Sequence, residues 1–458
     1  MRKEKGKMRK IFQYILLAVA VVATASCSNE LDEVLQPANN GTLQFIVSDF
    51  PAFGESPDTR VIGTQDVGKT AWANEDKILV HLYSQKYGDQ AVTLTFDAEN
   101  NSWESDGGTL SYLENETPTI TAVYAPYCEI KSDKTIGLLE GKKYGEAEYI
   151  LAKTAISENR LDIRFESGRN YSRLRISSEA NQELTVTTTG FTPAGATEVA
   201  TAAYTLTTDN NGNAFLYGVF AEDATVSVKQ GEVTLKDYTF TAEKNPNGTA
   251  HNKSYALDAT PVIDGTLGGK AEATAAEVET LVQQLKDYVD NGITTIIVPG
   301  SKSAIIEVDG IVLPAVSEAI YRLSKDESYN GKIDLILPDV TEIFDQEFHS
   351  ARALNSITLP KVTNLADQAF YGTLYLRTIT FGSVITEVNE LGAIFNQVGY
   401  NVGGCDLILN CGQMNESNVP APDLTNNIWK FKFENEFKSI TLTHTGENSE
   451  CDECKTLQ

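Results

Sequence analysis

Apolar and polar residues alternate with a period of two through most of residues 41–260. Ile78, Val80 and Leu82 are one example, separated by residues that would face the other side of a strand. Such alternation predicts strands with one buried face, and about thirteen short strands and no helix are expected here. Strands of this kind pack as β-sandwiches with their apolar faces inward. Their number favours two sandwiches, with a break near 155–170.

A helical period follows a stretch rich in Gly and small residues, 261–271, which is expected to be a linker. Thr274 and Glu277 form a capping box that predicts the start of a helix, and Gly292 predicts its end. A second helix is expected over 314–325. The apolar face of the first helix consists of Val278, Leu281, Leu285, Tyr288 and Val289.

The C-terminal third repeats itself with a 22-residue period. Asp345–Phe348 recurs as Asp367–Phe370, and Leu337-Pro338 recurs as Leu359-Pro360. A fixed period of this length predicts a solenoid, in which each coil buries its apolar side against its neighbours. The intervals between the other strand-like segments are longer than 22 residues, which indicates insertions. Strand-like segments of these coils are expected at 296–299, 335–338, 357–360, 379–382, 407–410 and 440–443.

Alternation within these short strands separates an inward side from an outward side. The inward positions are Leu335, Leu337, Ile357, Leu359, Ile379 and Phe381. The outward side chains are small and mostly carry hydroxyl groups, which suits shallow contact with a protein or a glycan. They form the candidate binding face, which consists of Asp334, Ile336, Ser356, Thr358, Thr378 and Thr380.

The first residues of the chain have the organisation of an export signal. Six basic residues lie within 1–10, an apolar run spans 11–22, and small residues precede Cys27. The run is shorter than the roughly 20 residues that a membrane span needs. The Cys after small residues resembles a lipobox, so Cys27 is expected to be the acylated first residue of a bacterial lipoprotein. Thr24 departs from the Leu or Val usual in that motif, which leaves plain secretory cleavage as an alternative.

An acidic stretch, Ser-Asn-Glu-Leu-Asp-Glu, follows Cys27. It resembles the export signal of surface lipoproteins in Gram-negative anaerobes, and a solvated tether is the alternative interpretation. The expected location is therefore the outer membrane, lipid-anchored and exposed at the cell surface. Removing residues 1–26 takes away six basic residues and one acidic residue, so the formal net charge changes from −26 to −31. Such a charge repels phosphate backbones, and nucleic acid is excluded as a partner.

Several short motifs follow one another in order between residues 59 and 176. They are Thr59-Arg60, Trp72-Ala-Asn-Glu-Asp76, Tyr124-Ala-Pro-Tyr127 and Ser172-Arg-Leu-Arg-Ile176. Together they resemble the fimbrillin-like family of surface lipoproteins, over about half of the chain. Members of that family are pilus subunits or related adhesins with tandem transthyretin-like sandwiches, and the resemblance implies that fold for 41–260.

In pilins of that family a protease cuts after an Arg in the first segment. Loss of the preceding strand opens a groove that a partner's strand fills. The resemblance maps such a cut to Arg60 and the removable strand to residues 43–47, and a solvated loop Arg is the alternative interpretation of Arg60. Trp72 and Trp103 are interpreted as core or edge packing rather than ligand platforms.

Each of the two clear repeats places a short strand before an aromatic residue, Phe348 or Phe370. This pattern resembles bacterial leucine-rich repeats of the surface-antigen (BspA-like) type, most clearly over 333–381. Ala369 fits the Ala-Phe turn of that type, and Glu347 departs from it. The resemblance implies a leucine-rich-repeat α/β solenoid.

Residue types that catalyse reactions or hold metal ions are sparse or scattered. The four His residues form no metal-binding pair, and no nucleophile elbow, P-loop or dinucleotide motif occurs in context. Carboxylates are numerous enough for a glycosidase pair, but no spacing nominates one. No enzymatic activity, cofactor or metal is expected. Cys451 and Cys454 could close a small disulfide loop, and a four-Cys zinc site with Cys405 and Cys411 is an alternative with loose spacing.

The predicted fold is mainly β, with tandem transthyretin-like β-sandwiches followed by a leucine-rich-repeat α/β solenoid. The expected function is that of a surface adhesin, or an accessory or tip pilus component, which binds a host or bacterial surface protein or glycan and also contacts other pilus subunits. One alternative is a structural pilin assembled by strand exchange. The other is a glycan-binding protein of a nutrient-uptake system.

The expected divisions of the chain are a signal peptide (1–26), an acidic tether (27–40), sandwiches (41–260), a linker (261–271), a solenoid with a helical cap (272–445) and a tail (446–458).

Overall fold

The computed structural model describes ten stretches of the chain, and within them the protein is mainly β. Twenty-seven strands and two α-helices lie in these stretches. None of the described helices combines the length and the apolar character needed to cross a membrane. The described residues are 43–53, 69–113, 116–157, 159–165, 169–243, 247–300, 305–308, 311–388, 394–410 and 437–443.

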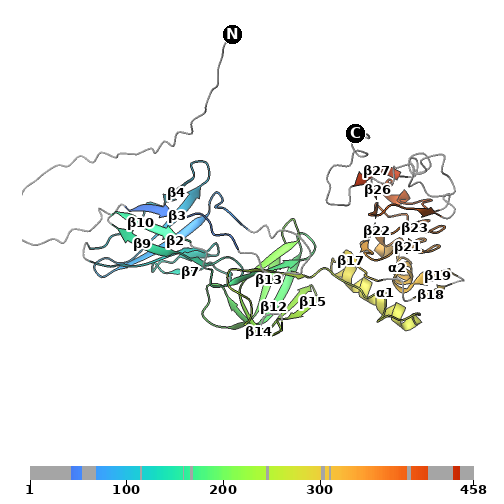
Figure 1. The fold of residues 1–458 in the computed structure, drawn as a ribbon, viewed down its shortest axis with the longest axis horizontal. Helices are drawn as coiled ribbons and strands as arrows, with labels where there is room; N and C mark the ends of the chain where they lie inside the picture. Colours follow the sequence, from blue (N-terminus) through green and yellow to red (C-terminus); the bar gives the residue numbers. More distant parts are fainter. Residues whose placement is uncertain are drawn as a thin grey trace, which may run out of the picture.

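Three groups of elements follow one another along the long axis of the molecule (Figure 1). We call them the first sandwich (residues 43–165), the second sandwich (169–259) and the C-terminal unit (260–443). Each group has its own main hydrophobic core. The β-sandwiches predicted from the alternating pattern are present, whereas their transthyretin-like topology stays a prediction.

The first sandwich encloses its core between a five-stranded sheet, in the order β4-β3-β2-β5-β8, and a three-stranded sheet, in the order β1-β10-β9. Ile78 and Val80 of β2 meet Leu161 and Ile163 of β10 in that core. Strand β1 runs parallel to β10. The strands are β1 (Gln44–Val47), β2 (Lys77–Ser84), β3 (Gly88–Asp97), β4 (Ser102–Ser105), β5 (Thr119–Tyr124), β8 (Ile150–Leu151), β9 (Lys153–Ser157) and β10 (Arg160–Arg164), with a separate hairpin of β6 (Cys128–Ile130) and β7 (Ile136–Leu138).

The second sandwich is organised around β14, a strand of 18 residues. The first part of β14 pairs with β11, and its last part pairs with β15. Strand β12 pairs with β14 over most of the length of β14. Leu216 and Val228, from the two parts of β14, lie in one core. The strands are β11 (Ser172–Ser177), β12 (Glu183–Pro193), β13 (Ala200–Thr207), β14 (Asn213–Gln230), β15 (Val233–Thr239) and β16 (Ser254–Asp258).

The two sandwiches contain sixteen strands within the described residues, where alternation predicted about thirteen. The additional strands include β6, β7 and β8, which are only two or three residues long. Such short strands cannot show a period of two. The chain passes from the first sandwich to the second between Arg164, the end of β10, and Ser172, the start of β11.

The C-terminal unit is built on a parallel sheet in which spatial order equals chain order, β17-β20-β22-β24-β26-β27. A second parallel sheet, β21-β23-β25, and a hairpin, β18–β19, complete it together with α1 and α2. The elements are α1 (Ala275–Asp290), β17 (Thr295–Ile297), β18 (Ile305–Val308), β19 (Ile311–Pro314), α2 (Ala315–Leu323), β20 (Ile333–Ile336), β21 (Glu342–Ile343), β22 (Leu354–Leu359), β23 (Asn364–Leu365), β24 (Thr378–Phe381), β25 (Glu387–Val388), β26 (Cys405–Asn410) and β27 (Phe437–Thr443).

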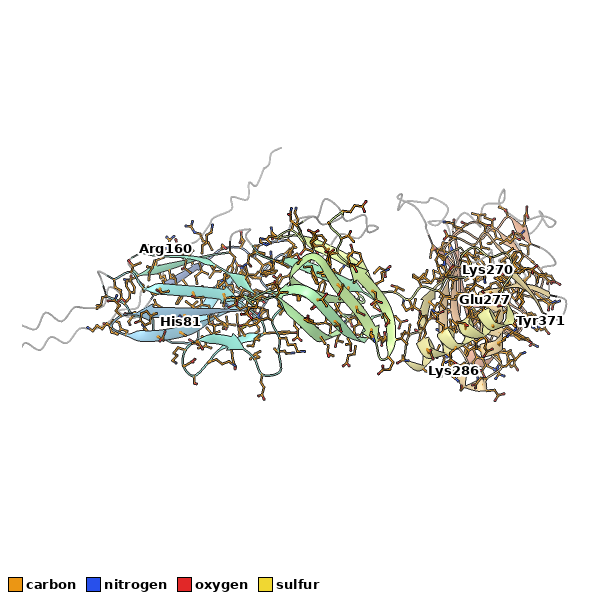
Figure 2. All side chains as sticks on the ribbon, turned by 90° about the horizontal axis from the view of Figure 1, so that it is seen from below. His81, Arg160, Lys270, Glu277, Lys286 and Tyr371 are labelled. Atoms are coloured by element: carbon orange, nitrogen blue, oxygen red, sulfur yellow. The ribbon has the colours of Figure 1, made fainter. Side chains whose placement is uncertain are left out.

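Helix α1 begins at the predicted capping box. The Glu277 N–H donates to the Thr274 hydroxyl over 3.3 Å, and the Thr274 N–H donates to the Glu277 carboxylate over 2.8 Å. Lys270 pairs with the same carboxylate, and this hydrogen bond contributes most to lowering the pKa of Glu277 to about 2. Figure 2 shows these two residues together, with Lys286 further along the helix. The charged side of α1 thus faces solvent while its apolar side joins the core.

The 22-residue interval is confirmed as the register of the parallel sheet. Strands β22 and β24 pair Ser356 with Thr378 and Leu359 with Phe381. All six positions predicted to face inward are at most 2 % exposed. Successive coils therefore stack with their apolar residues in line, and the assignment of these coils to leucine-rich repeats stays a prediction.

The predicted linker over 261–271 is in part a strand-like addition to the C-terminal unit. Val262 forms a bridge with Ile297 of β17, and Ile263 is 1 % exposed in the core of the unit. Leu267 also packs against that core, and the Pro261 carbonyl accepts a hydrogen bond from the Ile297 N–H over 3.0 Å. The composition hid these contacts because the residues that make them are separated by Gly and other small residues. The first residues of this segment therefore pack onto the C-terminal unit.

Polar contacts join the second sandwich to the C-terminal unit. Glu179, which follows β11, accepts hydrogen bonds from the backbone N–H of Thr294 over 2.9 Å and from its hydroxyl. The Gln230 side chain donates to the Asn291 carbonyl over 3.2 Å, and the Asn291 side chain accepts from the Glu232 N–H over 3.1 Å. Two loops of the sandwich therefore hold the segment between α1 and β17.

Candidate functional site

The six residues predicted as a binding face lie on the outward side of the parallel sheet. Each is half-buried, while the alternate residues of the same strands are buried. We call this outward side the ladder face, and its six strands span about 24 Å at the usual strand spacing. Its first row is Thr295, Asp334, Ser356, Thr378, Asp406 and Ser439, and its second row is Ile297, Ile336, Thr358, Thr380, Ile408 and Thr441.

Both carboxylates of the first row are held by hydroxyl groups of the following strand. Ser356 Oγ donates to Asp334 Oδ1 over 2.5 Å, and Ser439 Oγ donates to Asp406 Oδ1 over 2.6 Å. The Asn355 side chain donates to the same Asp334 oxygen over 2.8 Å. These hydrogen bonds fix the side chains within the sheet. The ladder face therefore presents short polar groups in fixed positions.

Sequence reasoning did not include Asp406 and Ser439 in the candidate face. Asp406 pairs with Thr378, and Ser439 pairs with Asp406, but each lies further along the chain than the 22-residue period would place it. A local signal was present: Asp334-Leu-Ile-Leu337 recurs as Asp406-Leu-Ile-Leu409. The repeated tetrapeptide occupies the same place in β20 and β26.

Behind the sheet, aromatic rings from successive coils form a stack. Phe370 lies between Phe348 and Phe395, with ring centroids 5.7 Å and 5.8 Å apart and planes within 10° of parallel. Glu347, the departure from the Ala-Phe pattern, is buried, and its carboxylate accepts a hydrogen bond from the Ser317 hydroxyl of α2 over 3.0 Å. The coil that contains Glu347 packs against helix α2 at this position. The coil that contains Ala369 packs against another coil, where the small Ala side chain fits.

Cys405 lies in the core with a fully enclosed side chain. Burial, reinforced by the neighbouring Asp406, raises the pKa of its thiol to about 12. Cys405 is one of the four cysteines of the zinc site considered from the sequence. The other three cysteines of that site, Cys411, Cys451 and Cys454, lie outside the described residues. Within the described part of the chain, no group of three His, Cys, Asp or Glu side chains is placed to hold a metal ion.

Cys27 and Arg60, the residues predicted for lipidation and processing, also lie outside the described residues. The strand expected to be removable is described as β1 (Gln44–Val47), an edge strand that pairs with β10 alone among the described strands. Leu43, Phe45 and Val47 pack against the core of the first sandwich. Strand β1 therefore occupies an apolar position at the edge of a sheet.

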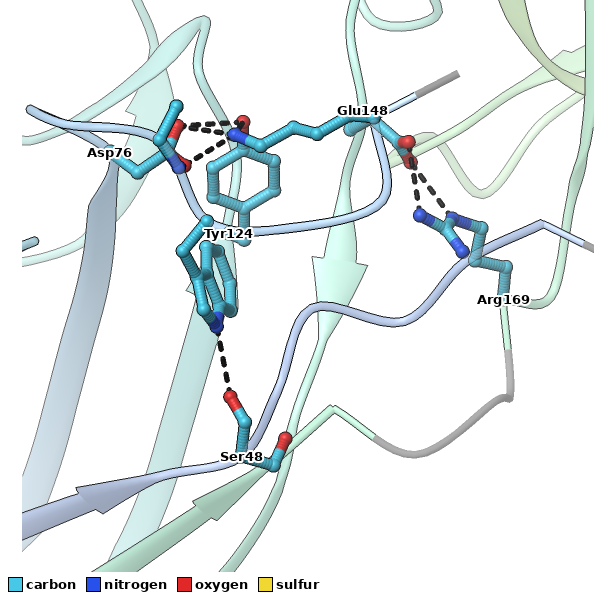
Figure 3. A network of polar contacts seen from close by, with 8 residues as sticks. Ser48, Asp76, Tyr124, Glu148 and Arg169 are labelled. Carbon is cyan, nitrogen blue, oxygen red and sulfur yellow. Dashed lines mark hydrogen bonds and ion pairs between the residues drawn. The ribbon is translucent and has the colours of Figure 1, made fainter. Parts of the chain in front are cut away.

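A polar network surrounds the segment that follows β1 (Figure 3). The Trp72 indole N–H donates to the Ser48 carbonyl over 2.9 Å. Lys69 pairs with Asp76 and donates to the Tyr124 hydroxyl over 2.7 Å. Burial is the main cause that raises the pKa of Tyr124, and the Asp76 carboxylate adds to it.

A second part of this network joins the two sandwiches. The Arg169 guanidinium donates to both carboxylate oxygens of Glu148, over 3.0 Å and 3.1 Å. The Arg169 side chain is fully enclosed, and Tyr171 donates to the same carboxylate over 2.5 Å. A bidentate pair of this kind fixes the guanidinium plane.

Trp72 and Trp103 pack edge to face, with ring centroids 4.9 Å apart, against the core of the first sandwich. This agrees with the interpretation of the two residues as core or edge packing.

Comparisons with known proteins give one coarse likeness. No family model matches the chain, and no curated protein matches it. Among solved structures, the chain is similar to a fimbrial protein from Bacteroides ovatus, with 9 % identity and a TM-score of 0.24. The match covers 48 % of this chain and 48 % of that protein, so it spans about half the length of each.

Proposed function

We propose that this protein is a lipid-anchored cell-surface adhesin, or an accessory or tip component of a pilus, which binds a protein or glycan through the ladder face. The role is binding rather than catalysis. The lipobox-like sequence at Cys27 and the acidic stretch after it support the anchoring. The observation that carries the binding role is the ladder face itself, two rows of mostly polar side chains in register across six parallel strands.

The chemistry of this surface favours an extended partner. Its polar groups are short, and its two carboxylates already accept hydroxyl groups from neighbouring strands. Ile336 and Ile408 interrupt the hydroxyl row with apolar contact area. A flat surface of this composition forms many weak contacts spread over its length, which suits another protein surface or a glycan chain.

Binding to arrays of immobilised matrix proteins and glycans tests this role. The test variant carries Thr358→Lys and Thr380→Lys, which place two long cations on paired strands of the ladder face. The control carries Thr185→Lys and Thr187→Lys on the exposed side of β12. We expect the control to bind as the wild type does and the ladder variant to lose at least about tenfold in affinity, equivalent to about 1.4 kcal/mol. Equal binding by the two variants would remove the ladder face from the proposal.

A structural pilin assembled by strand exchange is the second candidate. The edge position of β1, its apolar side chains and its place before Arg60 favour this candidate. Cleavage after Arg60 followed by assembly would support it. Clean cleavage that leaves a monomer in light scattering would favour the adhesin.

A further inference from the structure

We propose that a groove beside helix α1 is a binding site for an aliphatic ammonium group that carries a short hydrocarbon stem. The groove has a volume of about 300 Å³, at the lower end of the range for small-molecule pockets. It lies between the first half of α1 and the turn 264–267, and it shares no residue with the ladder face. The residues that line the groove are Asp264, Leu267, Glu277, Thr280, Leu281 and Gln284.

The apolar part of the groove consists of two leucines that pack on the core of the C-terminal unit. Leu281, on α1, is 4 % exposed, and Leu267 packs against the same core. Leu267 has a φ of +49°, in the left-handed region that residues with a Cβ rarely adopt. Residues in this conformation persist where the surrounding structure holds them, and they cluster at ligand sites. The hydrocarbon stem of a ligand would cover these two side chains.

The polar groups of the groove are mainly hydrogen-bond acceptors. The Thr280 hydroxyl donates its hydrogen to a backbone carbonyl of its own helix over 2.9 Å, so its lone pairs are left for a ligand. The Gln284 amide nitrogen donates to a tyrosine hydroxyl one turn further on over 3.0 Å, which leaves its carbonyl oxygen as an acceptor. Asp264 and Glu277 add two carboxylates. A ligand that suits this groove therefore brings donors and positive charge.

The two carboxylates are held in place by the groups around them. Asp264 accepts hydrogen bonds from the N–H groups of Thr266 and Gly268, each over 2.9 Å. The Thr266 hydroxyl also donates to Asp264, over 2.6 Å, and contributes most to lowering the pKa of this carboxyl group. Glu277 accepts the N–H and the hydroxyl of Thr274 in the capping box, each over 2.8 Å. Both carboxylates are therefore ionised at neutral pH, in a groove whose walls are preformed.

An ammonium group already lies on one of these carboxylates. Lys270 pairs with Glu277 (Figure 2), so this part of the groove accepts an alkylammonium in the structure itself. The Lys270 side chain is 51 % exposed, and an exposed pair of this kind separates at little cost. With Lys270 in place, the two carboxylates still leave one negative charge beside the groove. That excess matches a ligand with a single positive charge, and the formal net charge of −26 attracts cations to the chain as a whole.

The test measures the binding of n-pentylamine to the full chain by a ligand-observed NMR titration. The probe n-pentanol has the same stem without the charge, and methylammonium has the charge without the stem. We expect each of these two to bind at least about tenfold more weakly than n-pentylamine, because each lacks one half of the contact. Equal binding of n-pentanol and n-pentylamine, or no binding of n-pentylamine, would overturn the proposal.

Two variants place the binding in this groove. Asp264→Asn removes a charge but keeps an acceptor oxygen for Thr266, and it should weaken n-pentylamine binding at least about tenfold. Asp287→Asn, at an exposed position of α1 outside the groove, is the matched control and should bind within about twofold of the wild type. Thr280→Phe fills the groove from an exposed position and should abolish binding, whereas Gln283→Phe, exposed but outside the groove, should not.

Unchanged n-pentylamine binding by either Asp264→Asn or Thr280→Phe, each shown by circular dichroism to be folded, would overturn the site. A further probe, Nα-acetyl-lysine amide, identifies the source of the ammonium group. Affinity equal to that of n-pentylamine would support the site as one for a lysine side chain of another protein. Affinity at least about tenfold weaker, with n-pentylamine bound, would support it as a site for a free amine.

Discussion

Phe348 and Phe370 stack with their ring centroids 5.7 Å apart and their planes 10° apart, although they belong to successive coils of the chain. Both rings are at most 1 % exposed. The stack shows that adjacent coils bury their aromatic residues against each other, so the stability of each coil depends on its neighbour.

Phe370→Ala is therefore expected to destabilise the C-terminal unit by about 3–5 kcal/mol, the range for large-to-small changes in packed cores. The substitution opens a cavity between Phe348 and Phe395 at the same time. Thr380→Ala, on the ladder face, is expected to cost less than about 0.5 kcal/mol. Chemical denaturation of the two variants measures both values, and similar losses would contradict the assignment of inward and outward sides.

Local periodicity predicted much of this fold because the strands are short, regular and buried on one side. The pairing of Ser356 with Thr378 followed from the 22-residue interval alone. Phe395, however, follows Phe370 at a longer interval than that period, and the sequence gives no register for a coil with added residues. Phe395, Asp406 and Ser439 were missed for this reason.

Contacts between distant segments were beyond sequence reasoning for a different physical cause. Glu179 and Thr294 are 115 residues apart, and Arg169 meets Phe53 across a similar distance in the chain. Neither contact produces a periodic pattern in the sequence, because each involves a single side chain on a loop. The chemistry of the candidate face could thus be predicted strand by strand, whereas the contacts of Glu179 and Arg169 could not.

His349 provides a test of pH dependence. Burial lowers its pKa below the ordinary value of 6.5, and its ring stacks on Tyr371 with centroids 5.3 Å apart. The unfolded chain therefore binds this proton more readily than the folded chain does. The C-terminal unit should keep its stability above about pH 6.5 and lose part of it as the pH falls through 6.5 toward the lowered pKa of the folded state.

The measurement is thermal unfolding at pH 7.5 and at pH 5.0, for the wild type and for His349→Gln. The variant has no group that titrates at this position, so the wild type should lose more melting temperature between the two pH values than the variant does. The sign would be wrong if the variant were the more acid-sensitive protein.

Cys27→Ala tests the anchor. The small residues before Cys27 predict cleavage and acylation at that residue, and an acyl chain is the part of the protein that would hold it in a membrane. The variant is expected to move from the membrane fraction to the soluble fraction of the cells or to the medium. Cys128→Ala is a suitable control, because Cys128 is buried in the first sandwich. Unchanged detergent partitioning of the Cys27 variant would refute the lipoprotein assignment.

Glu179 holds the second sandwich to the C-terminal unit, and its removal should loosen that junction. Its carboxylate accepts hydrogen bonds from the Thr294 N–H and hydroxyl and from the Thr295 N–H. Glu179→Ala leaves these donors without their acceptor, which costs about 1–3 kcal/mol for a buried or partly buried group. Each 1.4 kcal/mol is tenfold in an equilibrium constant, so the Thr294 and Thr295 amides should exchange with deuterium roughly tenfold faster or more.

A matched control shows whether the effect of Glu179→Ala is confined to the amides of Thr294 and Thr295. Glu183→Ala removes an exposed carboxylate at the start of β12, four residues along the chain. It should leave amide exchange at Thr294 and Thr295 unchanged, and both variants should keep the protection of β14, which lies within the second core. If exchange at Thr294 and Thr295 stayed at the wild-type rate in Glu179→Ala, the carboxylate would not be what joins the two parts. Faster exchange there alone would mean that the C-terminal unit is held at its first strand by a side chain of the sandwich.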